Sequence, residues 1–524
     1  MSSEKQPDLL TTGQQQNPHH QDSSSSSSSV IHHNNTSHAD NGLDRRLTAR
    51  HLQFIAIGGT IGTGLFLGIG PALAHAGPAS LLLAFVLIAA VSFSVMTALA
   101  EMAAYMPVTG AFTVYASRFI DPSLGFAMGW ILLISWSLTL AVELVAAGLI
   151  IQYWNAGLNV GIWIAVFLVL FTAVNLLPIR WFGELEMWFS LIKVVFIVGF
   201  VIFAACFNAG AAGGNEGYIG FRYWQPNSPG AFAEHLVSGP AGSFVGFWVA
   251  LITAGFTYQG TELVAIGAGE TRDPAKEIPS AIRWTFYGIV TLFLATVLFV
   301  GIDVPFDHPG LSSSEAQDAS ASPLVIIANL AEKGALSHLI NAVLLTAVLS
   351  AANSDIYSSS RIMIALADEG HAPAWVRRTN AHGTPYWAVL FCSSFGLLGF
   401  LNLSSDGVTV FEWLLKITAV AGFVTWALIN LCHLRFMSVL RLRRQPRESL
   451  PYKAPFQPWL SIFGLVLNIA VLLTSGFTVF IQWSTVEFFA SYISIFIFLI
   501  LLVGHKLICR TRPIKIADVI LPTS

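Results

Sequence analysis

Charged residues are scarce in this sequence. Asp, Glu, Lys and Arg make up 10% of its 524 residues, whereas 54% of the residues are hydrophobic. Soluble domains carry roughly 25% charged residues, because a chain folded in water needs polar side chains on its surface. So little charge excludes a soluble protein of this length. The composition predicts an all-α polytopic membrane protein.

The sequence also has few cysteines and no phosphate-binding loop. Its four cysteines all lie in or beside predicted helices, where we expect neither a disulfide framework nor a metal site. The stretch "GGTIGTG" lacks the Lys-Ser/Thr pair and the preceding strand of a nucleotide-binding loop. A net charge of -3 gives no sign of nucleic-acid binding. We therefore expect no cofactor, no metal, no nucleic-acid partner and no use of ATP.

Long apolar runs, by contrast, are abundant. A membrane helix needs about 20 mostly apolar residues, and we count twelve windows that satisfy this. They lie at 51–75, 79–104, 124–150, 160–179, 187–207, 243–268, 282–302, 332–358, 385–402, 408–434, 460–483 and 486–508.

Two of these windows are interrupted. The first contains "GGTIGTG" and the sixth contains "FTYQGTELVAIGAGE". Broken helices at matching positions of two halves are typical of secondary transporters built from a five-plus-five inverted repeat. Unwinding between Thr60 and Gly64 frees main-chain N–H groups, which in a membrane must face a ligand-binding cavity, and a carboxylate suits them. Glycine can also serve close helix packing alone, but two matched breaks favour the transporter.

The predicted domains follow from these patterns. Residues 1–44 are rich in Ser, Asn and Gln and lack the apolar core of a signal peptide, so they are predicted to be a disordered cytoplasmic tail. Residues 45–510 form the predicted twelve-helix transporter domain, and residues 511–524 a cytoplasmic C-terminal tail. This orientation places 22 of the 26 Lys and Arg residues in the cytoplasm, in agreement with the positive-inside rule.

The third and eighth helices each carry a polar stripe. Ser135, Thr139 and Glu143 are spaced by four residues and share one helix face. A glutamate within the membrane is by default a functional candidate, here for proton or cation handling, with a structural hydrogen bond as the alternative. The eighth helix repeats the pattern, and interhelical packing is its favoured interpretation. Its stripe comprises Ser350, Asn353, Ser354, Tyr357 and Ser358.

Lys193 lies within the fifth window. Its position near one end leaves two interpretations open, a side chain that snorkels to the membrane surface and a functional ammonium group. Glu143 and Lys193 both have no charged neighbour one helical turn away. We therefore predict that these two residues carry out proton coupling.

Several long stretches resemble a known family. They include "RHLQFIAIGGTIGTGLFLGIG", "GFTYQGTELVAIGAGETRDPAKEIPSAIR", "SAANSDIYSSSRI" and "FEWLLKITAVAGF". From about residue 46 to 515 the chain resembles fungal amino-acid permeases of the amino acid, polyamine and organocation superfamily, and most of all the basic (arginine and lysine) permeases. The resemblance implies a secondary active transporter rather than an enzyme. It implies import of cationic L-amino acids across the plasma membrane by proton symport.

The resemblance also implies roles for individual residues. Thr60, Gly62, Thr63 and Gly64 would bind the substrate carboxylate, and carbonyls around Phe256, Thr257 and Gln259 would meet its amino group. Phe256 would close over the ligand, and Lys193 would stand where sodium-coupled relatives bind an ion. Glu262 is either a ligand contact or a brace between helices. Ser135 and Thr418 would select the side chain of the substrate.

Two residues depart from the family pattern. Lys416 would repel arginine if it faced the pocket. It lies about 200° around the helix from Thr418, so it points away if Thr418 lines the pocket. Asp355 would favour a cationic ligand if it faced inward, but it lies off the main polar stripe.

Other functions stay open on the sequence alone. A broad-range or neutral amino-acid permease of the same fold is the first alternative, and a non-transporting amino-acid sensor is the second. The expected partners are the amino-acid substrate, protons and membrane lipids. The tails are candidates for binding the trafficking or ubiquitination machinery, and Lys5 is the only lysine of the N-terminal tail.

Overall fold

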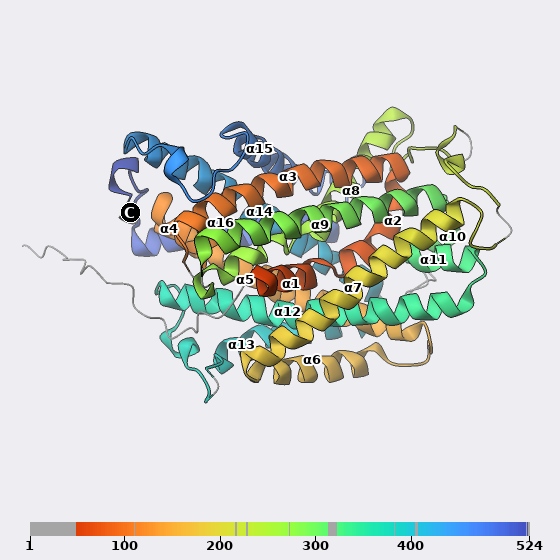
Figure 1. The fold of residues 1–524 in the computed structure, drawn as a ribbon, viewed down its shortest axis with the longest axis horizontal. Coiled ribbons are helices and arrows are strands. Elements are labelled where there is room, and N and C mark those ends of the chain that lie inside the picture. Colours follow the sequence, from red (N-terminus) through yellow and green to blue (C-terminus); the bar gives the residue numbers. More distant parts are fainter. Residues whose placement is uncertain are drawn as a thin grey trace, which may run out of the picture. The chain divides into compact units, whose positions relative to one another are not determined.

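The computed structural model describes residues 49–519 and 521, apart from 109, 215–216, 227–228, 272, 313–321, 382 and 404–406. The predicted tail at residues 1–44 lies outside the described residues. The described part contains helices and no strands (Figure 1).

Within the described ranges, eleven helices are long and apolar enough to cross a membrane, and the shorter apolar helix Val160–Leu176 lies at the predicted fourth span. Each predicted window coincides with one of these twelve, so the all-helical prediction is confirmed. The elements are α1 (Ala49–Thr60), α2 (Ile69–Ala76), α3 (Pro78–Tyr105), α4 (Ala111–Phe119), α5 (Pro122–Gln152), α6 (Val160–Leu176), α7 (Ile179–Asn208), α8 (Pro240–Tyr258), α9 (Pro274–Asp303), α10 (Pro309–Ser312), α11 (Pro323–Leu330), α12 (Gly334–Asp368), α13 (Tyr386–Ser394), α14 (Gly407–Leu442), α15 (Trp459–Thr474) and α16 (Thr485–Cys509).

Both predicted helix breaks are present. The first span ends as α1 at Thr60 and resumes through the π-helical turn Gly64–Gly68 into α2. The sixth span ends as α8 at Tyr258, and a 3₁₀ helix, Thr261–Glu270, follows. The two breaks touch at Gly260, which has a φ of 102°. A β-carbon there would lie 2.8 Å from Thr60 Oγ1, so a glycine is needed both for the backbone conformation and for the close approach.

Helix α5 is among the most buried spans and has neighbours on many sides. This helix packs against α12, α14, α4, α16 and α6, and 78% of its most apolar window is buried. Figure 1 shows α3, α9 and α12 running lengthwise while α7 crosses them obliquely. All five residues of the predicted α12 stripe are buried, so the stripe faces the bundle interior as expected.

The outer helices present apolar side chains to the surroundings. Only 17% of the apolar window of α16 and 28% of that of α7 are buried. Large apolar residues such as Val195, Leu473 and Ile500 are more than half exposed. Apolar surface of this extent belongs in lipid, since soluble proteins rarely expose contiguous apolar patches of more than a few hundred Å².

The segment after α16 is tied to the helix ends around it. The Ile514 main-chain N–H donates to the Ile120 carbonyl at 2.8 Å, and Arg435 donates to the Ile514 carbonyl at 2.6 Å. Arg443 donates to the Val519 carbonyl. The described part of the C-terminal tail is therefore docked onto α14 and the segment that follows α4.

Candidate functional site

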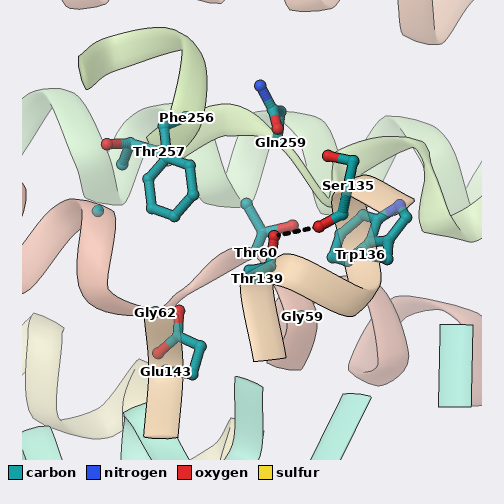
Figure 2. A pocket seen from close by; sticks show the side chains of 11 residues that line it. Gly59, Thr60, Gly62, Ser135, Trp136, Thr139, Glu143, Phe256, Thr257 and Gln259 are labelled. Atoms are coloured by element: carbon teal, nitrogen blue, oxygen red, sulfur yellow. Dashed lines mark hydrogen bonds between the residues drawn. The ribbon is translucent and has the colours of Figure 1, made fainter. Parts of the chain in front are cut away.

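A small cavity lies where the two helix breaks meet α5 (Figure 2). It measures about 20 Å³, which is room for about one water molecule. An amino acid can therefore enter only after the surrounding groups shift. The lining residues are Gly59, Thr60, Gly62, Gly64, Ser135, Trp136, Thr139, Glu143, Phe256, Thr257 and Gln259.

Most residues singled out in the sequence meet at this cavity. Thr60, Gly62, Gly64, Ser135, Glu143, Phe256, Thr257 and Gln259 line it. Thr63, Lys193, Glu262 and Thr418 are buried beside it or behind it. Trp136 also lines the cavity, although the sequence did not single it out. It directly follows Ser135, and an aromatic residue in an apolar helix gave no signal of its own.

The first break is occupied by a side chain of the protein. Glu143 Oε1 accepts hydrogen bonds from the Thr63 main-chain N–H, at 3.3 Å, and from the Thr63 hydroxyl, at 2.9 Å. Glu143 Oε2 is buried without a hydrogen-bond partner. The donors that the resemblance assigns to a substrate carboxylate are thus held by the Glu143 carboxyl group in this conformation.

The glycines of the break allow α5 and α8 to approach. A β-carbon on Gly62 would lie 2.7 Å from Glu143 Oε1, and one on Gly64 would lie 2.7 Å from Thr257 Oγ1 and 2.9 Å from Thr257 Cα. A larger residue at Gly64 would therefore push α8 away, whereas one at Gly62 would displace the Glu143 carboxyl group.

The second break makes mostly local hydrogen bonds. The Thr257 hydroxyl donates to the Thr253 carbonyl at 2.7 Å, and Gln259 Nε2 donates to the Ala419 carbonyl of α14 at 2.9 Å. Glu262 Oε2 accepts from the Gly260 N–H at 3.1 Å. In this conformation Glu262 therefore holds the turn of the break itself.

Ser135 and Thr418 join α5 to α14. The Ser135 hydroxyl donates to the Thr418 carbonyl at 3.2 Å. The Thr139 hydroxyl donates to the Ser135 carbonyl at 3.0 Å, as the dashed line of Figure 2 shows. The Thr418 hydroxyl is fully buried and donates within its own helix. Thr418 thus lies directly behind Ser135 rather than on the cavity wall.

Lys193 is fully buried and does not snorkel, so that interpretation is wrong. Its ammonium donates to the Gly58 carbonyl at 2.5 Å, two residues before α1 ends. The last carbonyls of a helix have no partner within the helix, and the negative end of the helix dipole attracts a cation. The lysine thus binds where the break leaves acceptors free.

Glu143 and Lys193 have no charged neighbour one turn away on their own helices, as the sequence indicated, but charged residues of other turns and helices lie near Lys193. Glu143, Glu186 and Asp355 all lie close enough to Lys193 to interact with its charge. Sequence reasoning missed Glu186, because the predicted fifth span began at residue 187 whereas α7 begins at Ile179. The signal was available: Glu186 and Lys193 are seven residues apart, a spacing that places them on one helix face.

Lys416 does not line the cavity, although Thr418, from which its direction was inferred, does not line it either. Its ammonium bonds to Glu487 Oε2 of α16 at 2.5 Å, and the neighbouring Trp413 donates to Glu487 Oε1 at 3.1 Å. Its charge is therefore paired between two helices and does not face a ligand at the breaks.

Among the described residues, no group of three or more His, Cys, Asp or Glu is placed to hold a metal ion. All four cysteines are free. The chemistry of the site therefore lies in main-chain groups, hydroxyls, carboxyl groups and one ammonium.

Comparison with known proteins agrees with this architecture. Residues 51–517 match the family model described as amino acid permease. A probable lysine/arginine permease of Candida albicans is 42% identical over 88% of this chain and 80% of its own length. A basic amino-acid permease of Saccharomyces cerevisiae is 40% identical over 91% of this chain and 83% of its own. A proline-specific permease of Emericella nidulans is 41% identical over 89% of this chain and 86% of its own. With its many apolar helices and its paired breaks, this chain belongs to the amino acid permease family of multi-pass membrane transporters.

Proposed function

We propose that this permease imports cationic L-amino acids, arginine and lysine above all, across the plasma membrane by proton symport. The observation that carries the proposal is the position of Glu143. Its carboxyl group lies on the cavity wall and accepts both Thr63 donors at the first break.

Proton coupling follows from a competition at Thr63. A substrate carboxylate seated on the first break needs the donors that Glu143 Oε1 holds. Two carboxylates in one dry site repel each other, so the substrate binds best when Glu143 has taken up a proton. By thermodynamic linkage, bound substrate raises the proton affinity of Glu143 by the same factor by which the proton raises the affinity for substrate. Symport is the net result when both are released on the other side.

Lys193 supports the same mechanism. Its ammonium holds the Gly58 carbonyl, which belongs to the helix half that leads into the break. A charged ammonium fixes this half of the helix, and a neutral amine binds it less strongly. Loss of the lysine proton would therefore release α1, so the position of the helix would depend on protonation.

The preference for cationic substrates rests on charge. Glu143 is a cavity-lining acid, and Lys416 is paired with Glu487 outside the cavity. Two of the relatives named above are lysine/arginine or basic amino-acid permeases. In this scheme Ser135 and Thr418 select the side chain, Phe256 closes over the ligand, and Thr257 and Gln259 lie near the amino group.

A neutral substrate is the alternative, and one observation favours it. The proline-specific relative is 41% identical to this chain, as similar as the basic permeases. Overall identity therefore does not choose between substrates. The sensor alternative and a role of the N-terminal tail in trafficking concern properties beyond this site, and both stay hypotheses, as does the cytoplasmic location of the two termini.

The test is uptake of labelled amino acids by the purified protein in liposomes. We expect an imposed proton gradient to drive accumulation of arginine, and unlabelled lysine to compete while proline does not. Competition by proline and other neutral amino acids as strong as that by lysine would favour the neutral permease. Binding of amino acids without uptake or exchange would favour the sensor.

A further inference from the structure

Asp355 has no partner in the middle of α12. Its side chain is 1% exposed, and neither carboxyl oxygen has a hydrogen-bond partner. Asp303 also has a buried oxygen without a partner, but its other oxygen accepts from Asn208 at 2.8 Å. Asp355 therefore lies in the protein interior with no protein donor for either oxygen.

The position of Asp355 is behind the first helix break. Ala351 of α12 would lie 3.2 Å from a β-carbon on Gly62, and Ser354 would lie 3.6 Å from one on Gly59. Asp355 follows Ala351 by four residues and so shares the face of α12 that looks onto the break. It does not line the cavity, so it belongs to the rear of the site.

Four ionisable groups lie near enough there for their charges to interact. The charges that interact with Asp355 come from Glu143 of α5 and from Lys193 and Glu186 of α7. The cluster thus contains three carboxyl groups and a single ammonium. One carboxylate can balance the lysine, and the other two must stay neutral or leave unpaired charge in a dry interior.

The hydrogen bonds decide which carboxyl group stays ionised. Glu186 accepts from the Ser350 hydroxyl at 2.6 Å and from Asn353 Nδ2 at 3.5 Å. Glu143 accepts from Thr63 through one oxygen only. Asp355 accepts nothing. Donors stabilise a carboxylate, so Glu186 is the natural counter-ion of Lys193. Asp355 is the group for which the charged form is least supported.

We propose that Asp355 is a second proton-binding site, so that the permease binds two exchangeable protons around Lys193, one on Glu143 and one on Asp355. In the closed conformation described here the Asp355 carboxyl group holds its proton. When α1 moves and water reaches the rear of the break, the carboxyl group ionises and the proton passes to water. A second coupled proton then accompanies each substrate, an extension that rests on the proposed proton symport.

Proton binding itself can be tested without transport. The variant Asp355→Asn keeps the size of the side chain and removes the proton. We expect infrared difference spectra between neutral and alkaline pH to show the carbonyl band of a protonated carboxyl group in the wild type. This band should lose one component in Asp355→Asn and recover it in Asp355→Glu. Equal bands in the wild type and in Asp355→Asn would overturn the proposal.

A matched control is Asp303→Asn on α9. This acid is also fully buried with one oxygen unpartnered, but it is not among the charges that interact with Lys193. Thermal unfolding of each purified variant without substrate identifies any variant that fails to fold. If Asp355→Asn does not fold, the infrared spectrum of Asp355→Glu is compared with that of the wild type instead.

Coupling is measured as arginine accumulation in liposomes with the membrane potential clamped at zero. Each coupled proton contributes about tenfold accumulation per unit of pH gradient. For a gradient of one pH unit, we expect the wild type and Asp303→Asn to accumulate arginine about a hundredfold, and Asp355→Asn to accumulate it about tenfold. An unchanged ratio in Asp355→Asn would overturn the second coupled proton. If the wild type itself fails to accumulate arginine, the proposed symport fails, and the infrared comparison still decides whether Asp355 binds a proton.

Discussion

At the scale of single residues, the contact between Thr63 and Glu143 links ligand binding to protonation. One carboxyl oxygen of Glu143 accepts two hydrogen bonds from Thr63, and the other has no partner. Because only one Glu143 oxygen has donors, a substrate carboxylate can displace Glu143 from Thr63. Protonation of Glu143 makes this displacement easier. The function of the site is thus concentrated in two side chains from different helices.

Replacement of Thr63 by valine should weaken the binding of every substrate alike. All amino acids share the carboxylate that this residue is proposed to hold, and one hydrogen bond to a charged group corresponds to about a ten- to hundredfold change in affinity. Competition binding with arginine, lysine and proline checks the result. The control is Thr172→Val on α6, whose hydroxyl donates only within its own helix. A Thr63→Val variant that reaches the membrane and merely changes its substrate preference would contradict the assignment.

At the scale of helices, α1 is held to α7 at Gly58. The Lys193 ammonium donates to its carbonyl, and Glu186 packs so closely that a β-carbon on Gly58 would lie 1.7 Å from Glu186 Oε1. The absence of a side chain on Gly58 therefore allows Glu186 and Lys193 of α7 to approach α1. This contact should move whenever α1 moves.

We expect Gly58→Ala to displace Glu186 and to reduce uptake strongly. The matched control is Gly199→Ala, also in a helix, where a β-carbon would meet nothing within 4 Å. Alanine at that position should be neutral or stabilise the helix by about 0.5–1 kcal/mol. Thermal unfolding of the purified variants and uptake in liposomes check both results. Wild-type uptake by Gly58→Ala would show that Glu186 and α1 are not in the contact described.

Lys193→Met should shift the pH dependence of transport, because methionine fills similar space but removes the ammonium charge that interacts with Glu143 and Asp355. The measurement is the uptake rate of arginine across a series of external pH values. Lys333→Met, at the exposed start of α12, serves as the control and should keep the wild-type profile. A Lys193→Met profile that follows the wild type would remove Lys193 from coupling.

The breaks were predictable from the sequence, and the charge cluster was not. Glycine and polar residues stand out in an apolar window, so "GGTIGTG" and "FTYQGTELVAIGAGE" were visible without a structure. Glu186 was missed because the predicted fifth span began at residue 187, eight residues after the start of α7. Asp355 lies off the polar stripe of α12. Its charged neighbours come from α5 and α7, so only the packing of the helices reveals them. Lys416 and Glu487 form a pair between two helices. The two residues are 71 positions apart in sequence, so no local pattern reveals the pair.

At the scale of the whole molecule, the C-terminal segment closes one end of the helix bundle. Asp121, just before α5, accepts from Lys506 of α16 at 2.6 Å and from Thr511 at 2.8 Å. Burial tends to raise the pKa of the Asp121 carboxyl, but the hydrogen bonds from Lys506, Thr511 and Ser123 outweigh it and hold the pKa below its ordinary value of 3.8. The contact therefore favours the ionised carboxylate.

This contact should weaken in acid. A carboxyl group with a lowered pKa adds stability above its ordinary pKa, and this stability is lost as the pH falls through the folded value. We expect limited proteolysis next to Arg510 and Arg512 to become faster below pH 3.8, when measured with an acid-active protease. At neutral pH, where trypsin replaces the acid-active protease, Asp121→Asn should already be cleaved faster than the wild type after Arg510 and Arg512, and equal rates for both proteins would contradict the role of Asp121.

The central claim is that the proton bound by Glu143 drives amino-acid accumulation. The most direct measurement compares, for Glu143→Gln in liposomes, arginine uptake under an imposed proton gradient with exchange of labelled for unlabelled arginine at equal pH. Glutamine keeps the size of the side chain and the acceptor for Thr63 but carries no exchangeable carboxyl proton. The account predicts that accumulation is lost while exchange survives. Accumulation by Glu143→Gln with the pH dependence of the wild type would contradict it.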